Sequence, residues 1–264
     1  MRVFYDLEDI RGAIPAPAVT VGSFDGVHAG HRAILRTLAD TARKKGGESV
    51  VVTFAPHPRQ VLHPDDRSLR LLNSLEEKIY LLEQAGVDNL LVVRFTPEFS
   101  RLDSETFVRR YLLEGIGAKS IVLGYNHQFG HDREGDRDFL EKLKEAHDFE
   151  VIQVPKQEVS EQKVSSTVLR FLIGAGELAQ AREILTEPYF FIGKKGECGL
   201  LEYGEPAKLF PPPGTYPVSV EDGGSVFDTR LLIHDGKLGL PLPAQSHCQP
   251  EERLIVRFKN EPKL

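Results

Sequence analysis

The sequence predicts an α/β protein, in which a Rossmann-like open parallel sheet over residues 1–186 is followed by a small β-rich, barrel-like domain over residues 187–264. Two observations support this fold class. Apolar, strand-like segments alternate with amphipathic helical segments as far as Val154, which is the pattern of a parallel sheet covered by helices on both faces. After Glu187 the helical periodicity ends, and prolines separate short alternating segments that favour an all-β unit.

The alternation begins after a short lead-in. Arg2–Ile14 is expected to form a strand or an extended segment, and Pro15 and Pro17 keep it from continuing as a helix. Apolar runs then predict strands of a parallel sheet at residues 19–21, 49–54, 89–95, 119–124 and 149–154, and the near-continuous apolar run at 49–54 predicts a strand buried on both faces. Helical spacing of apolar residues predicts helices at residues 29–43, 75–85, 104–114 and 136–147. The second of these opens with a possible capping box of Ser74 and Glu77.

In the C-terminal part, apolar and polar residues alternate over short segments, which is the pattern of β-strands. Strands are expected at residues 214–220, 227–234 and 253–258. The change from helical periodicity to short, proline-separated segments predicts a domain boundary near Thr186–Pro188. The alternative is that a short β-rich tail completes one larger domain.

Composition excludes several classes of protein. The 264 residues are 41% hydrophobic and 27% charged, as in an ordinary globular chain. A net charge of −6 argues against a nucleic-acid or anionic-membrane surface, although a local basic pocket for a phosphate ligand remains compatible with it. No apolar run is long enough for a membrane span and the N-terminus lacks a leader pattern, so cytoplasmic residence is expected. Cys198 and Cys248 fit reduced thiols, with a disulfide between them as the alternative; the oligomeric state is open.

The segment Gly22–His31, GSFDGVHAGH, follows the first buried strand and leads into the first long helix. Its three glycines permit positive φ and the close approach of a ligand. His28 and His31 lie in or beside the first helical turn, where unpaired backbone N–H groups and the helix dipole favour an anion. The pattern predicts a phosphate site; a histidine-bearing loop without chemistry is the alternative.

This segment resembles the H-x-G-H signature of the nucleotidylyltransferase superfamily. Its G-x-F-D-G-x-H form is similar to the FAD synthetase module of bacterial bifunctional riboflavin kinase/FAD synthetases, a resemblance that covers residues 19–191. It implies the nucleotidylyltransferase fold and catalytic roles for His28 and His31. It implies nucleotide-binding roles for Gly22, Ser23, Phe24, Asp25 and Gly30. The family often has asparagine at the position of Ser23, and Asp25 is open either to a turn role or to metal binding through water.

Two further segments follow predicted strands. TFAPHP, residues 53–58, is similar to the family's T-F-x-P-H-P segment, which implies that His57 lies near a nucleotide or flavin phosphate; a rigid turn residue is the alternative. GYNHQFG, residues 124–130, is similar to G-x-(D/N)-x-x-F-G, which implies Asn126 beside a flavin and Phe129 in the pocket wall. The alternative for this segment is a surface turn stabilised by Asn and Gly.

A fourth segment, SSTVLR at residues 165–170, stands where a helix should begin. Helix capping alone would account for Ser165 or Ser166. The segment also matches the superfamily's second phosphate-binding motif, S-S-T-x-(I/L)-R. This implies that Ser165, Ser166, Thr167 and Arg170 bind the β- and γ-phosphates of ATP, with Ser166 and Arg170 as catalytic residues.

The resemblance implies transfer of AMP from ATP to FMN, which yields FAD and pyrophosphate. Such a reaction needs positioned charge rather than a nucleophilic side chain, and Mg²⁺ is expected to arrive with the phosphates of ATP rather than on a protein metal site. Two alternatives remain. His127, where an aromatic residue is usual, and Ser23 leave open another phosphate-bearing acceptor. A non-catalytic flavin- or nucleotide-binding paralogue is the second.

The C-terminal part resembles the riboflavin kinase barrel in one segment, LFPPPGTYPV at residues 209–218, which is similar to L-P-P-x-G-x-Y. The stretch after Phe191 has no equivalent of the family's G-F-P-T-A-N motif. A shortened, kinase-like barrel without riboflavin kinase activity is therefore expected.

Overall fold

The computed structural model describes residues 1–66, 68–125, 127–131, 134–156, 158–159, 162–196, 200–241 and 253–259. The chain forms two compact units, each of which we describe by itself. Unit 1 comprises Met1–Leu69 and Lys78–Glu158, and unit 2 comprises Arg70–Glu77 and Val159–Leu264. In the part described, no helix has the length and apolar character that a membrane crossing requires.

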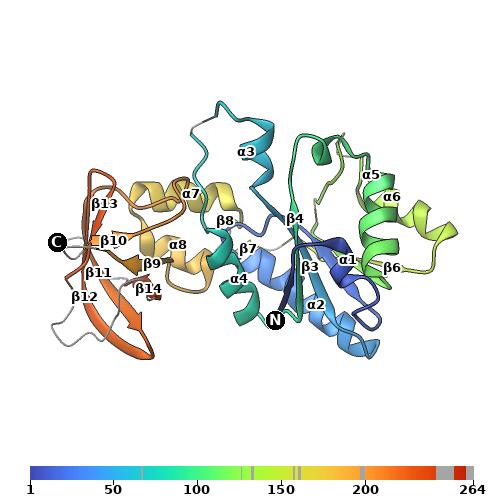
Figure 1. Ribbon diagram of the computed structural model, residues 1–264, viewed down its shortest axis with the longest axis horizontal. Coiled ribbons are helices and arrows are strands. Elements are labelled where there is room, and N and C mark those ends of the chain that lie inside the picture. Colours follow the sequence, from blue (N-terminus) through green and yellow to red (C-terminus); the bar gives the residue numbers. More distant parts are fainter. Residues whose placement is uncertain are drawn as a thin grey trace. The chain divides into compact units, whose positions relative to one another are not determined.

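Unit 1 contains a six-stranded parallel sheet in the order β1-β4-β3-β2-β5-β6 (Figure 1). Its strands are β1 (Arg2–Phe4), β2 (Ala18–Val21), β3 (Ser49–Ala55), β4 (Asn89–Arg94), β5 (Ser120–Leu123) and β6 (Glu150–Gln153). The five strands predicted for the parallel sheet are confirmed as β2 to β6; β2 and β5 are buried throughout, whereas β6 is only partly buried. Strand order reverses at β2, which pairs with β3 on one side and with β5 on the other. Open α/β sheets bind ligands at the carboxyl edge beside such a reversal.

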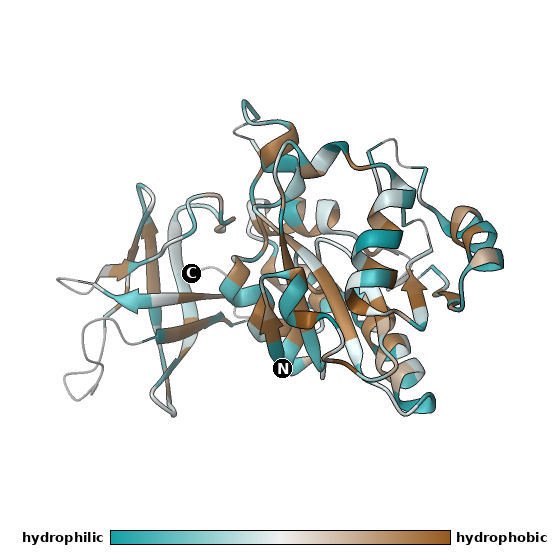
Figure 2. Cartoon of the chain, turned by 45° about the vertical axis from the view of Figure 1, so that its right-hand side comes forward, coloured by the Kyte–Doolittle hydropathy of each residue, from teal (hydrophilic) through white to brown (hydrophobic). Residues whose placement is uncertain are grey.

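Helices and helical turns connect these strands. They are α1 (Leu7–Ile10), α2 (Ala29–Lys44), α3 (Pro58–Leu62), α4 (Leu75–Gln84), η1 (Phe99–Arg101), α5 (Ser104–Phe107), the π-helical η2 (Val108–Ile116), α6 (Arg137–Leu143) and η3 (Lys144–Ala146). The four predicted helices are confirmed, and α4 begins with the expected capping box: the Glu77 amide donates to Ser74 Oγ at 3.1 Å, and the Ser74 amide donates to Glu77 Oε2 at 3.0 Å. The strands of the sheet are mostly hydrophobic (Figure 2), because α2 packs on β2, β3 and β5.

The lead-in is not purely extended. Only Arg2–Phe4 forms a strand, and Leu7–Ile10 forms the short helix α1. Ile10 is fully buried in the core of unit 1, and α1 packs against η2. A contact with a distant helix therefore decides the conformation of this segment, which local pattern could not reveal.

Unit 2 contains a closed antiparallel barrel in the order β10-β13-β12-β11-β14-β9. Its strands are β9 (Phe190–Lys195), β10 (Leu200–Glu202), β11 (Gly214–Asp222), β12 (Ser225–His234), β13 (Lys237–Gly239) and β14 (Arg253–Phe258). The three strands predicted in this region correspond to β11, β12 and β14. A separate two-stranded sheet is formed by β7 (Glu158–Val159) and β8 (Gln162–Lys163).

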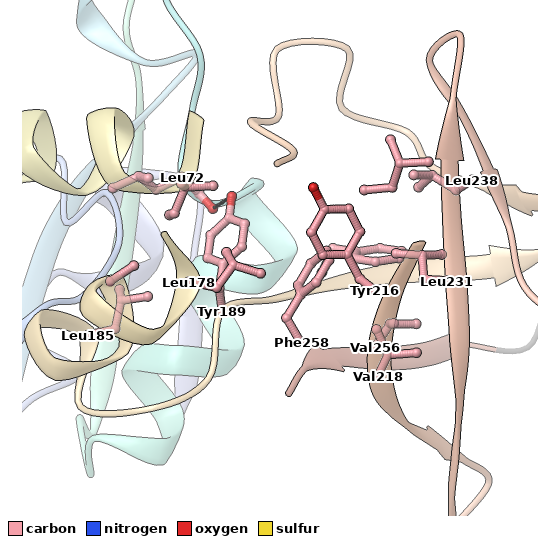
Figure 3. Close-up of a cluster of buried hydrophobic side chains, with 14 of the residues drawn as sticks. Leu72, Leu178, Leu185, Tyr189, Tyr216, Val218, Leu231, Leu238, Val256 and Phe258 are labelled. Atoms are coloured by element: carbon pink, nitrogen blue, oxygen red, sulfur yellow. Dashed lines mark hydrogen bonds between the residues drawn. The ribbon is translucent and has the colours of Figure 1, made fainter. Parts of the chain in front are cut away.

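Two helices, α7 (Ser166–Ala175) and α8 (Leu178–Leu185), share one core with the barrel. Figure 3 shows leucines of α8 near Tyr189, and the rings of Tyr216 and Phe258 among apolar barrel residues. The compact units thus divide near Glu158, whereas the barrel itself starts just after the boundary expected at residues 186–188. That domain boundary stays a prediction.

A buried ion pair ties residues 70–77 into unit 2. The Lys208 ammonium donates to Glu77 Oε2 at 2.6 Å and to the carbonyl oxygens of Leu72 and Phe190 at 2.7 and 2.9 Å. Neither charged side chain is exposed to solvent. The carboxylate of Glu77 also accepts from the Ile192 amide and from the Tyr203 hydroxyl, each at 3.0 Å. This network fully satisfies a buried charge pair, which would otherwise be costly.

Candidate active site

The turn that follows β2 has an unusual backbone. Phe24 and Val27 have φ of +46° and +35°, and Gly26 between them has φ of +93°. Residues other than glycine rarely occupy this region, and such conformations concentrate at functional sites. Burial holds the turn in place, because Phe24 is 2% and Val27 1% exposed. At Gly22 an added Cβ would lie 3.0 Å from the Phe24 ring, so a larger residue would displace that ring.

His28 caps helix α2, so it stands just outside the helix, while His31 lies in the first turn. The backbone N–H of His31 donates to His28 Nδ1 at 3.3 Å. A neutral His28 therefore carries its proton on Nε2 and can donate it to an anion. The two imidazole rings stack with centroids 3.7 Å apart and planes 10° apart. Gly30, the second helical residue, has no side chain to obstruct the helix N-terminus, where anions bind readily.

Both histidines are held neutral. Burial lowers the pKa of His28 from 6.5 to about 4, against a smaller opposing effect of the Asp25 carboxylate. Burial also lowers the pKa of His31, and the positive charges of His28, Lys78 and His127, when present, lower it further. Among the described residues the Nδ1 atom of His31 is buried without a hydrogen-bond partner. The pair can donate hydrogen bonds to a phosphate, and a bound polyanion would favour protonation.

Lys78 is a member of this site that the sequence analysis missed. It belongs to α4, is 5% exposed, and donates from Nζ to Thr53 Oγ1 at 3.3 Å. Burial lowers its pKa from 10.5 to about 8, while Asp25 raises it. One sequence signal could have found it: Lys78 is three residues after Leu75 and four before Leu82, so it interrupts the apolar face of the helix.

The segment after β3 gives His57 a local structural role. His57 is the N-cap of α3, where its Nδ1 accepts from the Arg59 amide at 3.2 Å. Its own amide donates to Gln60 Oε1 at 3.0 Å, which completes a capping box. The rigid-turn alternative thus has a structural basis, and a contact of His57 with a phosphate stays a prediction.

In the segment after β5, Asn126 lies outside the described residues, whereas Phe129 is held from several sides. The Ser104 hydroxyl donates to the Phe129 carbonyl at 3.0 Å, and Phe129 pairs with Gly135 in an isolated antiparallel bridge. An added Cβ at Gly135 would lie 2.4 Å from the Phe129 ring. This packing fixes Phe129, and the role of the segment in flavin binding stays a prediction beside the alternative of a turn stabilised by Asn and Gly.

Phe129 belongs to an aromatic cluster in unit 1, whose rings form successive contacts with centroids 5.3–6.3 Å apart. Its members are Phe54, Phe95, Phe99, Phe107, Tyr111, Phe129 and Phe139. Phe54 lies near the end of β3 and Phe95 directly follows β4, so the cluster gathers at the carboxyl edge of the sheet. The His127 ring lies 5.9 Å from that of Phe129, and burial lowers the pKa of His127 to about 4. It is therefore a neutral aromatic ring at the position where the resemblance leads us to expect an aromatic side chain.

The residues of the fourth motif lie in unit 2. Ser165 is the N-cap of α7, and its Oγ accepts from the Val168 amide at 3.3 Å. Ser166 and Thr167 form the first turn of the helix. Arg170 donates from Nε to the Arg70 carbonyl at 2.7 Å, which fixes the position of its side chain. His28 and His31 are in unit 1, so the sharing of one ATP by the two sets stays a prediction.

Metal ligands and cavities in the part of the chain that the structure describes bear on these motifs. Among the described residues no group of three or more His, Cys, Asp and Glu side chains could hold a metal ion. A cavity of about 370 Å³ in unit 2 is lined by Glu76, Ile192, Gly193, Lys194, Glu202, Tyr203, Gly204 and Arg253. It contains none of the predicted site residues. Because Arg253 forms an ion pair with Glu76 at 3.1 Å, two opposite charges in its wall are already matched.

A solved structure has the same fold over nearly the whole chain. It is a crystal structure described as a macrolide-efflux protein from Streptococcus pneumoniae, with a TM-score of 0.80 and 26% sequence identity. The match covers 99% of this chain and 90% of that one.

Similar sequences come from bacterial flavin enzymes. A FAD synthetase of Listeria monocytogenes is 34% identical over 212 residues, 79% of this chain and 82% of the relative. A bifunctional riboflavin kinase/FMN adenylyltransferase of the same species is 38% identical over 171 residues, 65% of this chain. This match spans only 54% of that relative's length. The bifunctional enzyme of Pseudomonas fluorescens is 32% identical over 233 residues, 85% of this chain and 74% of the relative.

The profile of the FAD synthetase family matches residues 13–168, which include the turn with both histidines, the segments after β3 and β5, and the first residues of α7. The chain therefore belongs to the FAD synthetase family.

Proposed function

We propose that this protein is an FMN adenylyltransferase, which transfers AMP from ATP to FMN and releases pyrophosphate. The observation that carries the proposal is the pair of stacked, neutral histidines at the N-terminus of α2, beside the reversal of strand order. Membership of the FAD synthetase family supports the acceptor. A cytoplasmic location belongs to the same proposal, because ATP is a substrate.

The reaction joins an oxygen of the FMN phosphate to the α-phosphorus of ATP, and the bond from that phosphorus to the leaving pyrophosphate breaks. The FMN phosphate is itself the nucleophile, so the chain has to position two anions and stabilise their charge. In our proposal His28 and His31 donate N–H groups to phosphate oxygens, and the turn at residues 22–30 lets the triphosphate approach the backbone. Ser165, Ser166, Thr167 and Arg170 are proposed as a second set of phosphate ligands.

The aromatic cluster supports FMN over other phosphate-bearing acceptors. A flat, heteroaromatic isoalloxazine ring gains from contact with aromatic rings, whereas an aliphatic acceptor such as a polyol phosphate gains less. We propose that the flavin lies against this cluster near Phe129, with Asn126 and His57 close to it. His127, as a neutral ring against Phe129, is compatible with a flavin, so its departure from the family pattern favours no other acceptor.

Magnesium fits the proposal as an ion carried by ATP. Mg²⁺ commonly binds through one or two carboxylates and the phosphates of its nucleotide, and it keeps several waters. Asp25 is the buried carboxylate of the turn and is the residue of this chain that we propose for such a contact. The ion would neutralise phosphate charge during the transfer.

The direct test incubates the purified protein with FMN, ATP and Mg²⁺ and separates the products by chromatography. FAD and pyrophosphate should appear in equal amounts. The same assay with CTP, and with phosphopantetheine or a polyol phosphate in place of FMN, tests the alternative acceptors. Absence of FAD at high protein concentration would refute the proposal, and tight FMN binding without product would favour the non-catalytic alternative.

A further inference from the structure

Lys78 holds a positive charge at a place where the fold gives that charge little compensation. Its ammonium makes one hydrogen bond among the described residues, to Thr53 Oγ1 at 3.3 Å, although an ammonium has three protons to donate. The hydroxyl of Thr53, which is fully buried, in turn donates to the Ser23 carbonyl at 3.4 Å, and Ser23 belongs to the turn that follows β2. The lysine is thus connected through a single hydroxyl to the backbone of the turn.

The charges around Lys78 come from three elements. Asp25, on the turn after β2, is 3% exposed and acts on Lys78 with opposite charge. His31, on α2, is neutral, and Lys78 contributes to keeping it so. On α4 itself the adjacent carboxylate, that of Glu77, is bound by Lys208 at 2.6 Å. Asp25 is therefore the main negative charge that Lys78 meets in the free protein.

A buried ammonium with one long hydrogen bond and one partner charge is destabilising relative to an apolar side chain of the same size. Its presence needs a reason other than stability. A bound polyphosphate would supply the missing negative charge, in a region of low dielectric where the interaction is strong. The two histidines do not supply a positive charge before the ligand arrives, because both are neutral.

We propose that Lys78 is a positioning residue of the phosphate site, whose buried ammonium attracts and holds the polyphosphate of the nucleotide bound at turn 22–31. It acts through Thr53 and the turn backbone, and through its electrostatic effect on Asp25 and His31. This inference rests on the proposed function, since it takes ATP as the ligand. The competing explanation is a purely structural electrostatic attraction between Lys78 and Asp25.

The two explanations differ in the sign of a stability change. If Lys78 is structural, then Lys78→Met removes the positive charge that acts on the buried carboxylate of Asp25 and lowers the midpoint of thermal unfolding. If Lys78 is kept for the ligand, Lys78→Met leaves that midpoint unchanged or raises it. The affinity for inorganic pyrophosphate and for MgATP, measured by calorimetry without FMN, should then fall about tenfold to a hundredfold.

The control is Lys142→Met, which removes the same charge from an exposed position of α6. It should change neither the affinity nor the unfolding midpoint. Lys78→Gln serves as a second variant if the methionine variant fails to fold, and far-UV circular dichroism checks both. Histidine NMR gives a readout without activity: removal of a nearby positive charge should raise the pKa of His31 in the variant.

The pH profile provides a further test. Deprotonation of Lys78 removes its charge as pH rises through about 8, so kcat/KM for ATP should fall above that pH in the wild-type protein. Lys78→Arg keeps its charge and should move this fall to higher pH.

Unchanged pyrophosphate affinity in Lys78→Met, or a lower unfolding midpoint with unchanged affinity, would overturn the inference. If the wild-type protein binds pyrophosphate but makes no FAD, the acceptor assignment fails and Lys78 is still judged by pyrophosphate affinity.

Discussion

At the scale of single residues, the turn at residues 22–31 combines neutral histidines with the buried cation of Lys78. His28 uses Nδ1 to cap α2, so its remaining N–H at Nε2 is the group left for a ligand. His31 stacks on it and is also within 5.1 Å of the Phe24 ring, measured between centroids. The two rings thereby fix each other's orientation, which is the requirement for donors that act on a phosphate.

Replacing His31 by asparagine should reduce kcat much more than stability. Loss of one charge-stabilising donor typically lowers kcat by about 10²- to 10³-fold. The unfolding midpoint should change little, because the cap of α2 uses the His31 backbone rather than its side chain. Steady-state FAD formation and thermal unfolding measure the two effects. His234→Asn, at an exposed position of the barrel, is the matched control; equal kcat in both variants would contradict a role for His31.

The histidines whose pKa is lowered should make the protein less stable in mild acid. His28 and His127 have a pKa of about 4 in the folded chain and 6.5 in the unfolded chain. Between pH 6.5 and about pH 4 the unfolded chain binds protons at these histidines and the folded chain does not. The contribution of the histidines to the free energy of unfolding is therefore complete above pH 6.5 and decreases as the pH falls to about 4.

The variant His127→Phe isolates one of these contributions. When the pH is lowered from 7 to 5, the free energy of unfolding of the wild-type protein should decrease by on the order of 1–2 kcal/mol more than that of this variant. Urea unfolding at the two pH values measures the difference. Identical pH dependence of both proteins would show that His127 is not held neutral by the fold.

At the scale of elements, the parallel strands β2, β3 and β5 end at one edge of the sheet. The N-terminus of α2, the N-terminus of α3 and the described residues that directly follow β5 therefore lie along that edge. Helix α4 belongs to both units, since the division falls between Glu77 and Lys78. Its Glu77 is bound in the core of unit 2, while Lys78 donates to Thr53 in unit 1. Adjacent residues of one helix therefore have opposite charges and separate partners.

The ion pair of Glu77 and Lys208 should be essential for the stability of unit 2. Lys208→Met removes one partner of a fully buried pair and leaves the carboxylate uncompensated, which costs about 3–5 kcal/mol. Chemical denaturation followed by circular dichroism measures the loss. Lys259→Met breaks a half-exposed pair with Asp228 and should cost less than about 1 kcal/mol. A loss of similar size in both variants would contradict the importance of burial.

At the scale of the whole molecule, a parallel α/β sheet and a closed antiparallel barrel are present in one chain. The barrel shares its core with α7 and α8, so the helix that begins with Ser165 and Ser166 is supported by barrel residues. The barrel thus stabilises α7 and α8 through this shared core, independently of any catalytic activity of the barrel itself.

We expect the barrel to lack riboflavin kinase activity. The stretch after Phe191 has no Pro-Thr-Ala-Asn sequence, which the resemblance to the riboflavin kinase barrel leads us to expect in an active kinase. Incubation of the protein with riboflavin, ATP and Mg²⁺ should therefore give no FMN, while FMN in the same buffer is converted to FAD. ATP-dependent formation of FMN from riboflavin would refute this expectation.

Much of the architecture can be predicted from the sequence, because the spacing of apolar residues along the chain identifies the buried face of each regular strand and helix. The capping box of Ser74 and Glu77 and the start of α2 are short-range features of the same kind. The short helix α1 was missed, because its conformation depends on packing against η2, which is more than ninety residues away in the chain.

The sequence by itself determined the family, and it predicted the four motif segments, since both depend on residue type and spacing along the chain. Only the tertiary structure decided which groups are buried together: the neutral state of His28 and His31, the place of Lys78 beside Thr53, and the aromatic cluster around Phe129. Burial and electrostatic coupling depend on neighbours from distant segments, and those neighbours exist only once β2, β3 and α4 have packed.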